Sequence, residues 1–516
     1  MVDVQKIQAT RPVEPPRATL TEVAGWLTAA GETPRVAGAA GTAVSGVTLS
    51  TARVLPGDLY AALPGARVHG ADYAAAAVDA GAVAVLTDAR GAEIVVAARP
   101  EVPVLVLDAP RRLLGALAGR LYGRPSQAMA MIGVTGTQGK TTTTQLAAGG
   151  LGRAGTTAAV VGTVGTLIDG EAIPTSLTTP EAPDLQALFA LMVERGVEVC
   201  AMEVSSHALV MGRVDGVVFD VAVFLNLGRD HLDFHTDVED YYRAKASLFT
   251  PERARRALIN ADDEHGRRLL GETTLPVATF SLHDEEATFR AVDVVCGARG
   301  STFTVLGPDG LRIETSVPLA GDFNVSNALA AIAACALAGQ DPVAVAAGIA
   351  AGDGVPGRLE DVEAGQDFAV VVDYAHKPDA VEATLRTLRP LTQGQLVVVI
   401  GAGGDRDTGK RPLMGEIAAR LADVVVVTDD NPRSEEPAQI RAQVLVGAHQ
   451  AVAAGSGAEV LEVGDRREAI RTAVRRARRG DIVLVAGKGH ETGQEVAGVV
   501  HPFDDRAVAR EELEAL

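Results

Sequence analysis

Cysteine, lysine and long apolar segments are all scarce in this chain of 516 residues. Its three cysteines, Cys200, Cys296 and Cys335, are too few and too scattered for a disulfide framework or a thiolate metal cage, which indicates a reducing compartment. The longest Ala-rich apolar run, residues 328–339, is well short of the ~18 residues that a membrane-spanning helix needs, and the first residues lack the apolar region of a signal peptide. We therefore expect a cytoplasmic protein without membrane insertion.

Basic residues are also fewer than acidic ones. The chain has 47 Lys and Arg against 66 Asp and Glu, a formal charge of −19. Such a surface is poorly suited to nucleic acid or anionic lipid, so we expect neither as a partner, although a local basic cleft could hold a small anion. Only six of the 47 basic residues are lysines, so a retained lysine could mark a place that needs a compact ammonium or a deprotonatable amine.

The length suggests three or four domains, at roughly 150 residues each. Short β-branched runs that end in Gly or Asp turns alternate with helical patterns rich in Ala, Leu and Arg, which predicts an α/β fold with parallel sheets. We expect a smaller N-terminal α/β domain (1–127) with a loose tail (1–17), a central domain (128–356) and a doubly wound C-terminal domain (357–516). The Gly- and Pro-rich residues 352–358 predict a hinge.

The clearest chemical signal follows the expected strand at 128–134. Glycines there let backbone amides wrap a phosphate, Lys140 reaches the terminal phosphates, and the Thr141 hydroxyl can bind magnesium. Val134 stands at the first glycine of the standard motif, but Gly-Lys-Thr-Thr in this position still favours phosphate binding over an ordinary turn. The residues expected to bind phosphate are Gly136, Thr137, Gln138, Gly139, Lys140, Thr141 and Thr142.

Three further candidates follow expected strands of the central domain. Glu203 is suited to be a magnesium ligand, but it could equally be an exposed loop acid. His231 has His235 four residues later, yet the Glu of a zinc-hydrolase motif is absent and a structural histidine is the simpler interpretation. Lys245 is compatible with a solvated helix position, although its retention as lysine leaves room for a modified amine.

The last domain places charged residues after several expected strands. Asp373 and His376 follow one such strand, where ribose or phosphate contacts commonly lie. Arg406, Arg433 and Glu491 could together recognise a ligand with both a carboxylate and an ammonium. A surface ion-pair network is an equal alternative.

Ten motifs resemble those of the Mur ligases and follow the same order along nearly the whole chain. They are TGTQGKTTTT, EVSSHAL, NLGRDHLDFH, YRAKASLF, NVSNALAA, GVPGRLE, DYAHKPDA, GGDRDTGKRP, DNPR and GKGHE. The resemblance implies an N-terminal domain for a uridine nucleotide, a central P-loop ATPase domain and a Rossmann-like C-terminal domain. It also implies an ATP- and Mg²⁺-dependent amide ligase of peptidoglycan synthesis. Such an enzyme would add diaminopimelate to UDP-N-acetylmuramoyl-L-alanyl-D-glutamate through an acyl phosphate.

The resemblance also implies roles for individual residues. Lys140, Glu203, His231 and Lys245 would be catalytic; Thr141, Glu203, His231 and N-carboxylated Lys245 would serve the metal. Besides the phosphate loop, ATP would contact Asn324, Asn327, Arg358 and Asp373. The UDP-linked dipeptide would contact Leu49, Thr51, Thr178, Thr179, Ser205 and Arg213. Diaminopimelate would contact Arg406, Asp430, Asn431, Pro432, Arg433, Gly487 and Glu491, and family members that add lysine generally lack the arginine of DNPR.

The chain departs from the family pattern mainly in its N-terminal domain. Ser50-Thr51-Ala52 stands where Asp-Ser-Arg is usual, His69-Gly70 where Asp-Gly is usual, and Met211 where a Gln can occur. We expect a monomer. Folylpolyglutamate synthase, which shares the ATPase core, is the alternative enzyme, and a non-catalytic nucleotide switch is the alternative from another class.

Overall fold

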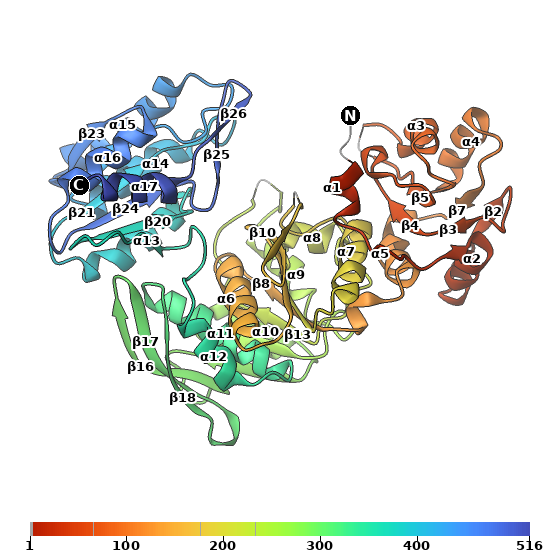
Figure 1. The fold of residues 1–516 in the computed structure, drawn as a ribbon, viewed down its shortest axis with the longest axis horizontal. Coiled ribbons are helices and arrows are strands. Elements are labelled where there is room, and N and C mark those ends of the chain that lie inside the picture. Colours follow the sequence, from red (N-terminus) through yellow and green to blue (C-terminus); the bar gives the residue numbers. More distant parts are fainter. Residues whose placement is uncertain (1–3, 66, 176, 233) are drawn as a thin grey trace. The chain divides into compact units, whose positions relative to one another are not determined.

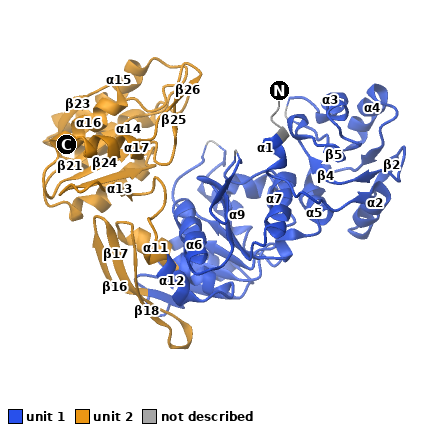
Figure 2. Cartoon of the chain, viewed as in Figure 1, with its two compact units in different colours: residues 1–290, 330–348 blue, residues 291–329, 349–516 orange. Residues whose placement is uncertain are grey.

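The computed structural model describes residues 4–65, 67–175, 177–232 and 234–516. Helices and strands are labelled as in Figure 1. The chain forms two compact units, coloured separately in Figure 2. Unit 1 comprises residues 1–290 and 330–348, and unit 2 comprises residues 291–329 and 349–516.

The N-terminal part of unit 1 contains a five-stranded sheet in the order β2-β7-β6-β5-β4. Its neighbouring strands are parallel except for the antiparallel pair β2 and β7. Alternate residues of the strands enter two separate apolar cores, since Leu59 and Leu86 face one side and Tyr60 and Val85 the other. The elements are β1 (Ala18–Thr19), α2 (Leu20–Ala29), β2 (Arg35–Ala37), β3 (Ala43–Val44), β4 (Gly46–Thr48), η1 (Thr51–Arg53), β5 (Asp58–Ala61), η2 (Gly70–Tyr73), α3 (Ala74–Asp79), β6 (Ala84–Thr87), α4 (Ala89–Ala98), β7 (Val104–Val106), α5 (Pro110–Leu121) and η3 (Pro125–Gln127).

The segment that precedes this sheet is fixed by a buried ion pair. After α1 (Val4–Gln8), Arg11 is 5% exposed; its Nη1 donates to Asp58 Oδ1 and to Tyr122 Oη, both at 3.0 Å, and its Nη2 donates to Asp58 Oδ2 at 3.2 Å. The expectation of a loose tail is therefore wrong for residues 4–11. The partner acid lies 47 positions further along the chain, so local composition could not reveal it.

The central sheet has eleven strands in the order β11-β10-β9-β12-β8-β13-β14-β15-β16-β17-β18. The expected parallel α/β sheet is confirmed, since the neighbours β9-β12-β8-β13-β14-β15-β16 are all parallel. Antiparallel strands extend the sheet at β10 and β11 on one side and at β18 on the other. Asp169 and Gly170 join β10 to β11 with φ angles of 51° and 79°, the conformation of a tight hairpin turn.

The strands of the central sheet are β8 (Ala130–Thr135), β9 (Ala158–Gly162), β10 (Gly165–Ile168), β11 (Glu171–Ile173), β12 (Val199–Glu203), β13 (Val221–Phe224), β14 (Ala257–Asn260), β15 (Val277–Ser281), β16 (Phe289–Gly297), β17 (Gly300–Leu306) and β18 (Arg312–Val317). The helices in this part of the chain are α6 (Lys140–Arg153), α7 (Ala182–Glu194), α8 (Ser206–Val210), α9 (Val238–Ala246), α10 (Glu264–Glu272), η4 (Pro308–Gly310), α11 (Asp322–Leu337) and α12 (Pro342–Ala350).

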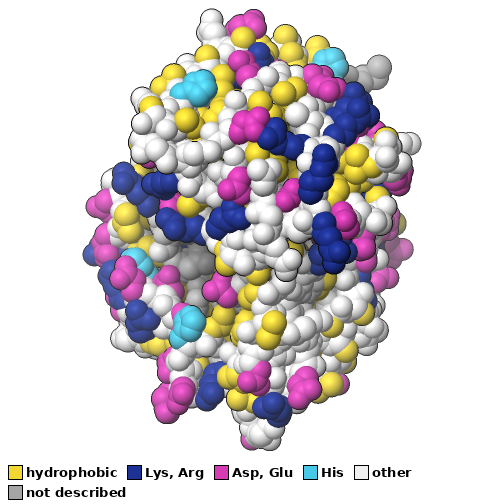
Figure 3. All heavy atoms as spheres, turned by 90° about the vertical axis from the view of Figure 1, so that its left-hand side faces the viewer, with side chains coloured by type: hydrophobic (Ala, Val, Ile, Leu, Met, Phe, Trp, Pro, Cys, Tyr) yellow, Lys and Arg dark blue, Asp and Glu magenta, His cyan; other side chains and the backbone are white. Residues whose placement is uncertain are grey.

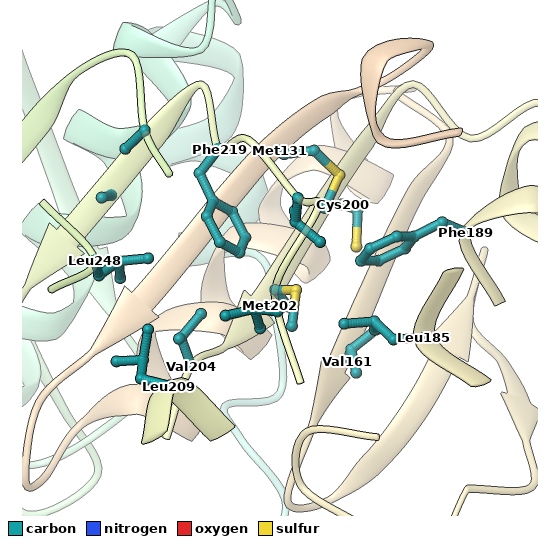
Figure 4. Close-up of a cluster of buried hydrophobic side chains, with 14 of the residues drawn as sticks. Met131, Val161, Leu185, Phe189, Cys200, Met202, Val204, Leu209, Phe219 and Leu248 are labelled. Atoms are coloured by element: carbon teal, nitrogen blue, oxygen red, sulfur yellow. The ribbon is translucent and has the colours of Figure 1, made fainter. Parts of the chain in front are cut away.

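A cluster of buried apolar side chains packs against the strands of unit 1's central sheet (Figure 4). Met131 on β8, Met202 on β12 and Phe219 ahead of β13 are all 0% exposed. A Cβ at Gly133 would lie 2.7 Å from Cδ1 of Phe219, so only glycine lets this ring pack against β8. The cluster thereby supports the strand that leads into the phosphate loop.

Unit 2 contains a six-stranded sheet in the order β19-β20-β24-β21-β22-β23. All neighbours are parallel except β19 and β20, which confirms the expected doubly wound arrangement. Its elements are β19 (Glu360–Asp361), β20 (Ala369–Asp373), α13 (Pro378–Leu388), η5 (Arg389–Leu391), β21 (Leu396–Ile400), α14 (Lys410–Leu421), β22 (Val424–Val427), α15 (Pro437–Ala453), β23 (Glu459–Glu462), α16 (Arg466–Arg476), β24 (Ile482–Ala486), β25 (Gly493–Val496), β26 (Val499–Pro502) and α17 (Asp505–Glu514).

Charged side chains of both signs are interspersed on the face of the molecule shown in Figure 3. Within unit 2, arginines of α16 pair with acids of α17: Arg467 with Glu511 and Arg471 with Glu512. Within the described part of the chain, no helix combines the length and the apolar character that crossing a bilayer requires. The domain boundaries and the hinge at 352–358 stay predictions.

The buried Arg11–Asp58 pair makes a prediction about stability. Arg11→Ala leaves the Asp58 carboxylate buried without its cation, and we expect the N-terminal region to lose about 3–5 kcal/mol of unfolding free energy. Trp26 on α2 is the chain's one tryptophan, so its fluorescence during urea unfolding reports on this region. Arg17→Ala, at an exposed position, is the matched control and should change the midpoint little. Equal midpoints for the two variants would contradict the assigned role of Arg11.

Candidate functional site

The predicted phosphate loop joins β8 to α6 in unit 1. Gly139 caps the helix in the left-handed conformation, with a φ of 85°, and no side chain of the described residues caps α6 at that position. The first amides of α6 are thus presented to an outside acceptor, as at anion sites on helix N-termini. This is the local geometry that the glycines and Lys140 predicted.

Asn226, two residues after β13, holds the loop from the side. Its Oδ1 accepts hydrogen bonds from the backbone N–H of Thr137 at 3.1 Å and of Gln138 at 2.9 Å, and its Nδ2 donates to the Gln138 carbonyl at 3.2 Å. Three bonds from one amide fix the backbone that would surround a phosphate. Sequence reasoning missed this residue, although its place after a strand was a usable signal.

Two lysines meet at one carbonyl of the loop. Lys140 Nζ donates to Gly136 O at 2.7 Å and to Thr137 O at 3.1 Å, while Lys245 Nζ, from α9, donates to Gly136 O at 2.8 Å. Lys245 is 1% exposed and lies over the ring of Tyr241 at 4.6 Å. The solvated position that was the simpler interpretation of Lys245 is therefore wrong.

Burial lowers the pKa of the Lys245 ammonium well below its ordinary value, and the nearby charge of Lys140 lowers it further, whereas Asp230 opposes the shift. A lowered pKa increases the fraction of neutral amine at pH 7, and the neutral amine is the nucleophilic form.

Glu203 ends β12 beside the phosphate loop and is 1% exposed. Its Oε1 accepts from the Thr141 hydroxyl at 2.9 Å and from the Thr163 amide at 2.7 Å, and its Oε2 accepts from the Thr163 hydroxyl at 3.1 Å. The alternative of an exposed loop acid is wrong. A hydroxyl and a carboxylate in contact form an oxygen donor pair that fits Mg²⁺, which takes few protein ligands besides water and substrate phosphates.

His231 lies beside Asp230, His207 and Tyr241 rather than in a closed metal cage. It has a positive φ of 53°, and its Nε2 is 3.4 Å from Asp230 Oδ2. Its ring meets those of His207 and Tyr241, with centroids 4.8 and 6.0 Å away. Among the described residues, no three His, Cys, Asp or Glu side chains form a group that could hold a metal ion.

The residues expected to contact the dipeptide gather around Glu203. Thr178 shares a hydroxyl hydrogen bond with Thr163 at 3.1 Å, and the Thr179 hydroxyl donates to the Glu203 carbonyl at 2.9 Å. Arg213 donates to the Thr179 carbonyl at 3.3 Å, and Ser205 caps α8. The structure therefore brings this predicted group beside the phosphate loop within unit 1.

Leu49 and Thr51 lie at the carboxyl end of β4 in the N-terminal sheet. Leu49 packs on the N-terminal core and Thr51 begins η1. In the same short helix Arg53 pairs with Asp184 of α7 at 3.0 Å. The uridine contacts predicted here stay predictions.

The DNPR turn of unit 2 follows β22. Asn431 Nδ2 donates to Glu491 Oε2 at 2.9 Å, and Arg433, with a φ of 54°, donates to the Gly404 carbonyl at 2.7 Å. The Arg433 Nε is 3.4 Å from Glu495 Oε2. Arg433 of this turn and Glu491, which follows β24, thus lie at the same sheet edge. Recognition of a ligand with opposite charges stays a prediction, beside the alternative of an ion-pair network.

The turn after β24 completes this cluster. A Cβ at Gly487 would lie 2.7 Å from Asp430 Oδ2, so glycine lets the Asp430 carboxylate approach the backbone. Asp430 is 6% exposed. Arg466, which sequence reasoning missed, is buried and donates to the carbonyls of Ala486 at 3.0 Å and Asp429 at 3.3 Å. It ties together the two turns that carry the predicted contacts.

Asp373 and Arg358 lie at the neighbouring strand end, β20. Burial raises the pKa of the Asp373 carboxyl, and the charge of Arg358 and hydrogen bonds from Leu359, Thr384 and Ala375 oppose this shift. The Arg358 guanidinium lies over the Tyr374 ring at 4.6 Å. Asp373 therefore shares the sheet edge with the DNPR turn, since β20, β24, β21 and β22 are successive parallel neighbours and the turn follows β22.

Arg406 is exposed on the loop after β21 and its side chain approaches the DNPR turn: a Cβ at Gly403 would lie 2.9 Å from Arg433 Nη1 and 4.0 Å from Arg406 Cγ. Asn324 and Asn327 are not brought into these clusters. Asn324 and Asn327 lie on α11, where Asn327 Nδ2 donates to Asn324 Oδ1 at 3.2 Å and Asn324 Nδ2 donates to the Ala320 carbonyl at 2.8 Å. Their proposed ligand contacts stay predictions.

Comparison with known proteins gives matches along almost the whole chain. Three family models match: the Mur ligase family catalytic domain at residues 43–122, the Mur ligase middle domain at 134–335 and the Mur ligase glutamate ligase domain at 357–489. A Streptomyces avermitilis protein described as UDP-N-acetylmuramoyl-L-alanyl-D-glutamate–2,6-diaminopimelate ligase is 55% identical over 505 residues, 98% of each chain.

Two further matches carry the same description. The Streptomyces coelicolor protein is 57% identical over 471 residues, which are 91% of this chain and 92% of that one. A solved structure with 36% sequence identity covers 92% of this chain and 95% of its own, with a TM-score of 0.67.

The contacts of Asn226 make a prediction about the phosphate loop. Asn226→Ala removes the side-chain support of the Thr137 and Gln138 amides, and we expect a non-hydrolysable ATP analogue to bind about tenfold more weakly, the size expected for losing one or two hydrogen bonds. Calorimetric titration measures the difference. Asn260→Ala is the matched control, because Asn260 ends the next strand and donates to Leu225 rather than to the loop. Unchanged affinity in Asn226→Ala would contradict the assigned role.

Proposed function

The chain belongs to the Mur ligase family, and we propose that it joins 2,6-diaminopimelate to UDP-N-acetylmuramoyl-L-alanyl-D-glutamate at the expense of ATP. Relatives of this description match up to 98% of the chain. The product of this reaction is a peptidoglycan precursor. The observation that carries the choice of amino acid is the cluster of Asn431, Arg433 and Glu491 at one sheet edge.

That cluster has the chemistry that diaminopimelate requires. Diaminopimelate carries a second amino-acid terminus that lysine lacks, with a carboxylate and an ammonium. Arg433 offers a planar fork of donors for the distal carboxylate, and Glu491 and Asp430 offer negative charge to the ammonium. Arg406, Pro432 and Gly487 complete the proposed contacts.

The phosphate loop of unit 1 is the proposed site of the ATP triphosphate. Residues 136–142 would surround the phosphates, with Lys140 as the counter-charge. Asn324, Asn327, Arg358 and Asp373 are the proposed contacts to the rest of the nucleotide. Thr141 and Glu203 fit Mg²⁺ by their oxygen donors, with His231 and modified Lys245 as further proposed ligands; bound there, the ion would neutralise phosphate charge.

The UDP-linked dipeptide has two proposed groups of contacts. Leu49 and Thr51 would meet the uridine end in the N-terminal sheet. Thr178, Thr179, Ser205 and Arg213 would meet the peptide end near Glu203. Arg213 is the cation of this second group, which suits the carboxylates of the D-glutamyl residue.

The proposed reaction has two steps. An oxygen of the D-glutamyl side-chain carboxylate attacks the γ-phosphorus, and the bond from that phosphorus to ADP breaks, which yields an acyl phosphate. The amine of diaminopimelate then attacks the acyl carbon, and the tetrahedral intermediate expels phosphate as the amine loses its proton. Lys140 offsets the repulsion between carboxylate and triphosphate, the main electrostatic obstacle to the first step. A cytoplasmic location and a monomeric state stay predictions.

The direct test is an ADP-release assay with UDP-N-acetylmuramoyl-L-alanyl-D-glutamate and one amino acid per reaction. We expect turnover with meso- or LL-diaminopimelate and little with lysine. Folate with glutamate tests the folylpolyglutamate synthase alternative. Turnover with folate, or nucleotide binding without turnover on any substrate pair, would overturn the proposal. Phosphate release at full rate without an amino acid would contradict the coupled scheme.

Arg433 makes a prediction about specificity. Arg433→Ala removes the partner of the distal carboxylate, and we expect KM for diaminopimelate to rise about 10- to 100-fold, as for a lost charge-assisted pair, with KM for ATP changed little. Steady-state kinetics with each substrate varied in turn measures both constants. Arg420→Ala is the control, because Arg420 pairs with Glu382 on the surface of the same unit. A comparable rise in both KM values would refute the pocket assignment.

Lys245 makes a prediction about modification. Its buried amine, with a lowered pKa, suits reaction with carbon dioxide to give an anionic carbamate, so Lys245→Ala should lower kcat by about 100-fold or more through loss of a metal-site oxygen. Added formate or acetate should restore part of the activity. Lys140→Ala is the comparison that should not be rescued, since it loses a cation. Failure of any small carboxylate to rescue Lys245→Ala would count against the carbamate.

A further inference from the structure

Lys488 is a buried ammonium that the proposed reaction leaves without a role. It follows β24 in unit 2, and its side chain is 0% exposed. Its Nζ donates to Asn431 Oδ1 and to Glu491 Oε2, both at 3.1 Å. Both partners are proposed contacts of diaminopimelate, so Lys488 lies directly behind the amino-acid pocket.

The backbone around Lys488 is built to place it there. Gly487 and Gly489 flank it with φ angles of 121° and 53°. A Cβ on Gly487 would lie 2.7 Å from Asp430 Oδ2, and one on Gly489 would lie 2.7 Å from the Tyr374 Cβ. Positions 487 and 489 therefore have no room for a side chain, and the turn between them directs the long side chain of Lys488 into the interior.

The residue type matters as well as the position. The chain contains six lysines among 47 basic residues and uses arginine almost everywhere else. A compact ammonium can approach two acceptors at 3.1 Å, whereas the planar guanidinium of arginine is larger and needs a wider site. Retention of lysine here is explained by the space between Asn431 and Glu491.

Lys488 also fixes the orientation of the Asn431 amide. An ammonium only donates, so the Asn431 carbonyl oxygen must face it, and that oxygen also accepts from the Glu495 amide at 2.9 Å. The Asn431 NH₂ group is consequently directed at Glu491 Oε2, at 2.9 Å. One cation thus sets the direction of the amide and balances the charge of the acid.

We propose that Lys488 is a positioning residue for diaminopimelate: it holds Asn431 and Glu491 in the arrangement that receives the distal amino-acid terminus. This inference rests on the proposed function. Because the hydrogen bonds of Lys488 among the described residues go to these two side chains, its loss changes the recognition of diaminopimelate and not that of ATP or the UDP-linked dipeptide.

The test is Lys488→Met, which keeps an unbranched side chain and removes the ammonium. We expect KM for diaminopimelate to rise about tenfold or more, as for the loss of a charge-assisted hydrogen bond, with the other two KM values within about twofold of wild type. Val474→Ala is the control: it removes buried volume from the core of the same unit, far along the chain from the DNPR turn, and should lower stability without changing KM for diaminopimelate. Lys488→Gln, which retains a donor, is the second variant if Lys488→Met fails to fold, and it should raise KM for diaminopimelate by a smaller factor.

A double-mutant cycle separates positioning from structural support. If Lys488 acts through Asn431 and Glu491, the variant Lys488→Met with Glu491→Gln raises KM for diaminopimelate by less than the product of the two single effects. Additive effects, or a rise in all three KM values together, would overturn the inference. An inactive wild type with diaminopimelate would instead overturn the proposed function, so the two failures are distinguishable.

Discussion

Parallel strands end at a common edge of their sheet, and the polar chemistry of this chain depends on that constraint. In unit 1, β8, β12 and β13 are neighbours, so the phosphate loop, Glu203 and Asn226 lie together although they are far apart along the chain. In unit 2, β20 and β22 lie on either side of β24 and β21, and Asp373, the DNPR turn and Glu491 share one edge. The faces of these sheets are covered by apolar side chains, so the polar residues lie in the turns that follow the strands.

Burial then changes what those polar groups can do. Lys245 and Lys488 are both almost completely excluded from solvent, but among the residues that the structure describes only Lys488 has a carboxylate within hydrogen-bond distance. The Lys245 ammonium donates to a neutral carbonyl and faces the charge of Lys140, and its pKa falls accordingly. The same residue type thus meets a neutral carbonyl and a second lysine in one unit and a carboxylate in the other.

Local sequence signals predicted the elements and most of the residues that follow them. Gly-Lys-Thr-Thr, Glu203 and DNPR could be found because each combines a recognisable turn with an apolar strand before it. Asn226 and Arg466 were missed. The place of Asn226 after a strand was a usable signal, but an Asn after a strand or an Arg at a helix start is common, and partners distant in sequence decide its role. The antiparallel extension at Asp169-Gly170 had a local hairpin signal that the parallel interpretation overlooked.

The Arg11–Asp58 pair makes residues 4–11 part of the folded N-terminal region. A shortened chain that starts at residue 12 would retain the Asp58 carboxylate and the Tyr122 hydroxyl in the interior without the guanidinium that joins them. A fusion partner ahead of α1 leaves that guanidinium in place. Removal of residues up to Arg11 is therefore limited by an ionic contact within the fold.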